Sequence, residues 1–132
     1  MTDITDYESQ NPRVALPKAV FLRAELAALR RSREQERRVT RREVVEAAIR
    51  AYLTEAEQAR AAQQPMHAER VVIRSGSPTV RISAAVRAQL AAEARQQAIE
   101  QQQDVAVGQL ATAAVTRYLD DLNVPFPQES GT

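Results

Sequence analysis

The stretch Pro78-Thr79-Val80-Arg81-Ile82-Ser83 decides how the chain is organised, because a second version of it occurs 66 residues earlier, as Pro12-Arg13-Val14-Ala15-Leu16-Pro17. In both hexapeptides apolar residues alternate with outward-facing positions, which is the period of a short strand with one buried face. The last residue of each favours a helix start: Ser83 as an N-cap and Pro17 at the first helical position. Each hexapeptide therefore predicts a strand that leads into a helix.

The similarity continues at the same offset, without a gap, from residues 12–53 (the first copy) to residues 78–119 (the second copy). Tyr52-Leu53 near the end of the first copy matches Tyr118-Leu119 in the second. This register indicates an internal duplication of a strand–helix–helix unit. A copy of this length buries little core alone, so we expect the two copies to fold together, with the strand near Val14 antiparallel to the strand near Val80.

Apolar spacing and end signals predict two helices in each copy. In the first copy they run from about residue 18 to 36, and from a capping box at Thr40-Arg41-Arg42-Glu43 to about residue 64, before Pro65. In the second copy they run from about residue 84 to 101 and from about residue 105 to 122, with Asp104 as the cap of the last helix. A second apolar stripe accompanies the first helix and consists of Leu22, Leu26 and Leu29.

These elements give a mainly α fold with a short two-stranded antiparallel β-ribbon. Five segments are expected: an acidic, disordered start (1–11), the first repeat (12–64), a connector (65–77), the second repeat (78–122) and a tail (123–132). Val71-Val72-Ile73 in the connector is strand-like, and it either adds to a sheet edge or covers the core.

Composition argues against catalysis and cofactors. The chain has no Cys, and its one histidine, His67, has no acid at ligand spacing in the sequence. No Gly-rich phosphate loop or nucleophile–base pair is present, so we expect no enzyme, catalytic residue, metal or cofactor. The polar, acidic start and the short apolar runs predict a soluble, cytoplasmic protein without a membrane span.

Charge is unevenly distributed although the whole chain has a net charge of only +1. Eleven bases and five acids give the first copy a net charge of +6, whereas the second copy, with four bases and three acids, carries +1. Residues 1–11 and 120–132 each carry −3. A basic unit between acidic ends is the asymmetry expected of a chain that meets a polyanion.

Both copies carry residues that resemble a known family. These are Val14-x-Leu16-Pro17, Val20 and Val44-x-x-Ala47-Ala48-Ile49-x-x-Tyr52-Leu53, which recur as Val80-x-Ile82-Ser83, Val86 and Leu110-x-x-Ala113-Ala114-Val115-x-x-Tyr118-Leu119. The pattern resembles the ribbon–helix–helix (MetJ/Arc-like) DNA-binding family over residues 12–53 and 78–119. The duplication suggests a tandem, single-chain pseudo-dimer similar in architecture to TraY-type conjugation accessory proteins.

The resemblance implies that two paired strands enter the DNA major groove and read base edges. If Val14, Leu16, Val80 and Ile82 face the core, the base-reading positions face outward. These are Asn11, Arg13, Ala15, Ser77, Thr79 and Arg81. Ala15 departs from the family, in which a polar residue is more usual, and weakens the reading power of the first copy. The alternative is a solvated ribbon whose arginines have no ligand.

The resemblance also implies that the start of the second helix of each copy holds a DNA phosphate through its free amides and dipole. The candidate residues are Thr40, Arg41 and Arg42 with Arg37 and Arg38 nearby, and Val107 and Gly108 in the second copy. The alternative for the arginines is a solvated helix face, and Gly108 could equally mark a frayed first turn.

The expected function is sequence-specific binding of double-stranded DNA, either as a plasmid relaxosome or transfer-origin accessory factor or as a transcriptional regulator. A relaxase or another transfer or regulatory protein is the candidate protein partner, and higher oligomers on DNA are left open. Two alternatives remain: an antitoxin of a toxin–antitoxin pair, and a helical scaffold that binds protein through the leucine stripe without binding DNA.

Overall fold

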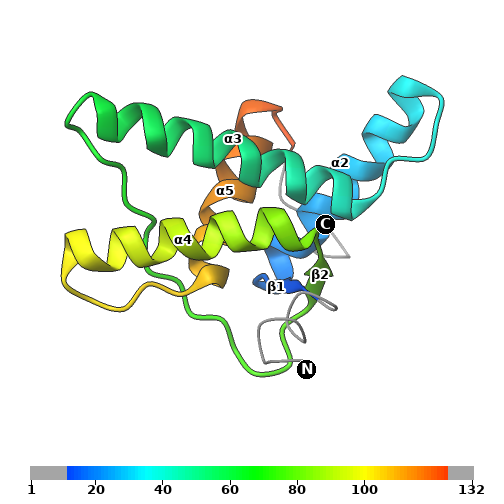
Figure 1. Cartoon of the computed structure of the whole chain (residues 1–132). Coiled ribbons are helices and arrows are strands. Elements are labelled where there is room, and N and C mark those ends of the chain that lie inside the picture. Colours follow the sequence, from blue (N-terminus) through cyan, green and yellow to red (C-terminus); the bar gives the residue numbers. More distant parts are fainter. Residues whose placement is uncertain (1–11, 125–132) are drawn as a thin grey trace, which may run out of the picture.

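The computed structural model describes residues 12–124, and in this part of the chain it contains four helices and two short strands (Figure 1). In chain order these are β1 (Arg13–Ala15), α2 (Lys18–Gln35), α3 (Arg41–Ala61), β2 (Thr79–Arg81), α4 (Ala84–Gln101) and α5 (Val107–Asp121). The offset of 66 reappears in the bounds of both strands, of α2 and α4, and in the starts of α3 and α5. The repeated pattern in the sequence thus corresponds to a repeated order of strand, helix and helix.

The two strands form an antiparallel two-stranded sheet, as predicted. Arg13 lies opposite Arg81, Val14 opposite Val80, and Ala15 opposite Thr79. Beyond the strands, the Leu16 amide donates to the Pro78 carbonyl at 3.1 Å, and the Ile82 amide donates to the Pro12 carbonyl at 3.2 Å. The ribbon thus joins the first copy to the second.

One hydrophobic core serves both copies. The inward residues of the ribbon, Val14, Leu16, Val80 and Ile82, are at most 5% exposed, which confirms the predicted alternation. They belong to the same buried cluster as Ile49 from α3 and residues of the other helices. The second helices, α3 and α5, pack against each other, and each also contacts α2 and α4. The expectation that the copies fold together is confirmed.

Two of the predicted helix starts are confirmed by their caps. The Thr40 hydroxyl accepts a hydrogen bond from the Glu43 amide at 3.2 Å, and the Ser83 hydroxyl accepts one from the Val86 amide at 3.3 Å. The carboxylate of Glu43, which a capping box would direct back to the Thr40 amide, accepts a hydrogen bond from Arg37.

Other predicted helix ends were wrong by a few residues. The N-cap of α5 is Ala106, which makes no side-chain cap bond, because Asp104 lies two residues too early to reach the first free amides. Pro17 occupies the N-cap position of α2 rather than the first helical position. The helix α3 ends at Ala61 rather than near residue 64.

The connector covers the core and does not extend the sheet. Among the described residues the sheet has two strands, and Val71-Val72-Ile73 belongs to neither. Buried glutamines from two helices hold Ala68: its amide donates to Gln97 Oε1 at 2.9 Å, and its carbonyl accepts from Gln109 Nε2 at 3.1 Å. These bonds satisfy polar groups that burial would otherwise leave unpaired.

The predictions for residues 1–11, including Asn11, and for the tail beyond Val124 lie outside the described residues. Val124, assigned to the tail, is buried. None of the helices between residues 12 and 124 combines the length and the apolar character that a membrane crossing needs.

Candidate nucleic-acid interface

The outward face of the ribbon presents polar side chains. Arg13, Thr79 and Arg81 are exposed, and Ala15 is half-buried. Hydrogen-bonded and non-hydrogen-bonded pairs alternate along the ribbon, and the Ile82–Pro12 pair next to Arg13 and Arg81 is hydrogen-bonded. Arg13 and Arg81 therefore form a non-hydrogen-bonded pair, whose Cα atoms in antiparallel sheets lie about 4.5 Å apart. A terminal nitrogen of Arg13 donates to the Thr79 hydroxyl at 3.2 Å. Two guanidinium groups and a hydroxyl are therefore concentrated on one small face.

Two further residues lie at the edges of this face. Ser77, predicted as a base reader, is half-buried, and its amide donates to the Arg74 carbonyl at 3.0 Å. Arg87, from the first turn of α4, donates through Nε to the Arg13 carbonyl at 3.1 Å. The sequence prediction missed Arg87, although its position four residues after the Ser83 N-cap places it beside the strand.

The start of α3 brings the predicted phosphate-binding arginines close to acidic side chains of the same molecule. Arg37 pairs with Glu43 at 3.2 Å and Arg42 pairs with Glu46 at 3.2 Å. Glu46 also accepts a hydrogen bond from the Ser83 amide at 2.6 Å, so this end of α3 is joined to the end of β2.

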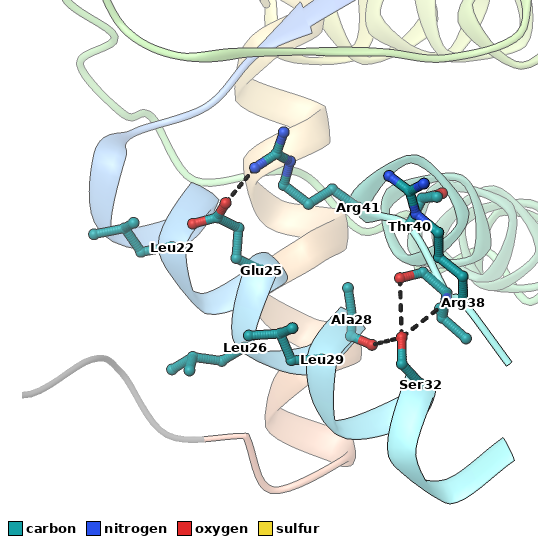
Figure 2. Close-up of a pocket in the computed structure, with 10 residues that line it drawn as sticks. Leu22, Glu25, Leu26, Ala28, Leu29, Ser32, Arg38, Thr40 and Arg41 are labelled. Atoms are coloured by element: carbon teal, nitrogen blue, oxygen red, sulfur yellow. Dashed lines mark hydrogen bonds and ion pairs between the residues drawn. The ribbon is translucent and has the colours of Figure 1, made fainter. Parts of the chain in front are cut away.

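Arg41 and Arg38 lie on either side of Thr40. Arg41 pairs with Glu25 of α2, as Figure 2 shows, and its guanidinium lies 4.7 Å from the centre of the Phe21 ring. Arg38 is exposed and has no ion-pair partner within residues 12–124. Exposed ion pairs contribute at most about 1 kcal/mol, so a phosphate could exchange for the carboxylates. The charge that the sequence assigns to this site is nonetheless largely compensated within the protein.

The start of α5 differs from that of α3. A Cβ placed on Gly108 would lie 2.6 Å from Cδ1 of Ile73 and 3.2 Å from the carbonyl oxygen of Ala15. Gly108 therefore permits a close approach between α5, the connector and β1, a packing role that the sequence prediction did not include. Val107 beside it is half-buried. The phosphate-binding roles of both residues stay predictions.

The leucine stripe lines an open groove between α2 and the start of α3 (Figure 2), with a volume of about 520 Å³. Leu26 is 40% exposed and Leu29 is 62% exposed. At the same positions of the second copy the chain has Ala88, Ala92 and Arg95 in place of Leu22, Leu26 and Leu29. The groove is thus a property of the first copy, and the shared fold does not require its leucines.

Away from the ribbon, an ion-pair network joins the end of α3 to α4. Arg60 bonds both Glu93, at 2.9 and 3.1 Å, and Glu100, at 2.7 and 3.2 Å. The Arg60 guanidinium lowers the pKa of Glu100 to about 2. His67 has no acid at ligand spacing in the sequence, but α4 brings Glu100 to it across the fold, and His67 Nε2 lies 3.1 Å from Glu100 Oε1.

This network joins α3 and the connector to α4. Among residues 12–124 no group of three or more His, Cys, Asp or Glu side chains is arranged to hold a metal ion. Burial raises the pKa of the Tyr52 hydroxyl, which accepts a hydrogen bond from Gln97 at 3.0 Å. These groups fasten the connector and the helices that support the ribbon.

Comparison of the chain with protein-family models, with curated proteins and with solved structures finds no match in any of the three.

Proposed function

We propose that the chain is a single-chain pseudo-dimer of two ribbon–helix–helix units, and that it binds duplex DNA by inserting the β1–β2 ribbon into the major groove. One observation carries the proposal: the ribbon buries Val14 and Val80 and exposes Arg13, Thr79 and Arg81 on its other face. A two-stranded ribbon fits the major groove, where base edges differ in their donors and acceptors. Four helices behind the strands give a short ribbon the support that it lacks alone.

The chemistry of the outward face fits base reading. An arginine can donate two hydrogen bonds to a guanine, and a threonine can contact a base edge or a thymine methyl group. The outward row of β1 is Arg13 and Ala15, whereas that of β2 is Thr79 and Arg81. Since the rows differ, the two half-sites in the DNA differ as well, and the preferred sequence is not a palindrome.

Arg37, Arg41 and Arg42 support binding to the DNA backbone, in exchange for their ion pairs with Glu43, Glu25 and Glu46. A protein of this kind acts as a transcriptional regulator or as an accessory factor at a plasmid transfer origin, with a relaxase as a candidate partner in the second case.

The test is selection of bound duplexes from a random pool, followed by titration of the preferred and of an unrelated duplex. Replacing Arg81 by Ala should cost about 1–3 kcal/mol on the preferred duplex and relax the preference at one position. Replacing Arg41 by Ala should weaken binding to both duplexes by the same factor. Arg95→Ala, at an exposed arginine of α4 outside the ribbon, is the matched control and should bind as the wild type does.

Failure of the wild-type protein to bind any duplex at low salt would refute the proposal. So would an Arg81→Ala variant that retains the full preference of the wild type. Suppose that Arg81→Ala weakened binding to both duplexes equally while Arg41→Ala weakened binding to the preferred duplex alone. Arg41 would then be the base-reading residue and Arg81 the phosphate-binding one, the reverse of the assignment proposed.

A further inference from the structure

Residues 70–92 contain four arginines and no acidic residue. The arginines are Arg70, Arg74, Arg81 and Arg87. Two of them have already been placed at the ribbon, and the other two, Arg70 and Arg74, belong to the connector. Both connector arginines are exposed, and neither has an ion-pair partner within residues 12–124. Arg70 and Arg74 contrast with the start of α3, where Arg37, Arg41 and Arg42 are each paired with a glutamate.

The structure holds this end of the connector beside the ribbon. The side chain of Ile73 lies against Gly108, whose other close neighbour is the carbonyl oxygen of Ala15 in β1. The amide of Ser77 bonds the carbonyl of Arg74 at 3.0 Å, which closes a turn directly before β2. In Figure 1 the connector passes α4, runs below the two strands and then turns up into β2. The backbone of Arg74 is therefore fixed close to both strands.

The direction of the Arg74 side chain follows from the packing of its neighbour. Successive side chains of an extended segment point to opposite sides. Ile73 is half-buried against Gly108, and the residue before it, Val72, is 81% exposed. Arg74, on the other side of Ile73, is likewise exposed. The Arg74 side chain is thus directed away from Gly108 and into solvent, from a backbone that leads into β2.

We propose that Arg74, together with Arg70 four residues earlier in the connector, binds the phosphate backbone of the DNA whose bases the ribbon reads. This inference rests on the proposed function. In the first copy the arginines at the start of α3 can serve that purpose, but the residues at the corresponding positions of the second copy are the uncharged Val107 and Gly108. The connector supplies the missing positive charge on that side, so the duplicated unit contacts the DNA backbone through different segments in its two halves.

The experiment measures the affinity of the full chain for its selected duplex and for an unrelated duplex over a range of salt concentrations. The slope of log affinity against log salt concentration is negative, and removal of one phosphate contact reduces its magnitude by roughly 0.9. Arg74→Ala should show this change on both duplexes, whereas Arg74→Lys, which keeps the charge, should retain most of the slope. Arg95→Ala should retain all of it. Circular dichroism should show the same helix content in every variant, since the substituted side chains are exposed.

Two outcomes separate this inference from the proposed function. If the wild type binds with a strong salt dependence and Arg74→Ala keeps the wild-type slope, Arg74 does not bind the phosphate backbone of the DNA, and the proposed function stands. If the wild type binds neither duplex, the proposed function fails and this inference fails with it. A loss on the selected duplex alone would make Arg74 a base-reading residue and would also overturn the assignment.

Discussion

The two copies of the strand–helix–helix unit have the same order of elements and pack into one core, but they differ on their surfaces. At several core positions the chain has apolar residues in both copies, as in Leu16 and Ile82 or Ile49 and Val115, all at most 1% exposed. At surface positions the copies differ freely, and Leu29 of the first corresponds to Arg95 of the second. Close packing restricts the residues of the core, whereas the charged surface and the groove each belong to one copy.

The clearest difference involves a buried charge. Arg23 of α2 is 4% exposed, and it donates to the carbonyl of Val124 and to the carboxylate of Asp120, both at 2.6 Å. These bonds fasten α2 to the segment that ends α5. The corresponding residue of the second copy is Gln89, which is exposed. The same position is therefore exposed in the second copy, whereas in the first its side chain is buried and bonds two segments together.

The largest expected effect tests whether the copies share one core. Leu16→Ala and Ile82→Ala each remove a fully buried side chain at the end of a strand, and each should cost about 2–5 kcal/mol. Since both residues belong to one cluster, urea denaturation should show a single transition shifted by either substitution. Two separable transitions, with each substitution moving one of them, would show that the copies fold as independent units.

A smaller effect is expected from the buried tie of the first copy. Arg23→Ala leaves the buried carbonyl of Val124 without its donor and should lower the free energy of unfolding by about 1–3 kcal/mol. Gln89→Ala, at the corresponding exposed position, should change it by no more than about 0.5 kcal/mol. Denaturant titrations of both variants make the comparison, and equal effects would contradict the asymmetry.

The smallest effect concerns acid stability. The pKa of Glu100 is about 2 in the folded protein, below its ordinary value of 4.5, because Arg60 donates to the carboxylate. Between these pH values the unfolded chain binds more protons, so the contribution of Glu100 to stability is present above pH 4.5 and is lost as the pH falls toward 2. Glu100→Gln should therefore weaken the decline of stability over this window.

Glu34 is the matched control for Glu100 because it occupies the same position in the first copy, where it is exposed and pairs with the exposed Arg30 at 3.4 Å. Glu34→Gln should keep the acid dependence of the wild type, measured by urea denaturation at a series of pH values. A Glu100→Gln variant with an unchanged decline below pH 4.5 would exclude Glu100 as a source of acid sensitivity.

The sequence alone was enough to predict a mainly helical fold with two antiparallel strands, one near Val14 and one near Val80, and the caps at Thr40 and Ser83. Alternation and capping depend on residues that are close together in the sequence, and the offset of 66 is visible in the sequence itself. All three can therefore be recognised without the tertiary structure. The same local signals also identified the outward positions Arg13, Thr79 and Arg81, which the structure exposes.

The partners of the charged side chains, in contrast, depend on tertiary contacts. Arg41 meets Glu25 because α2 and α3 pack against each other, and Ile73 reaches Gly108 because the connector crosses the start of α5. These contacts depend on how the helices cross and where a loop is held. The local periodicity of the sequence carries no information about either. Net charge along the sequence therefore placed the basic surface in the first copy, whereas the structure compensates much of that charge and leaves Arg74 exposed beside the ribbon.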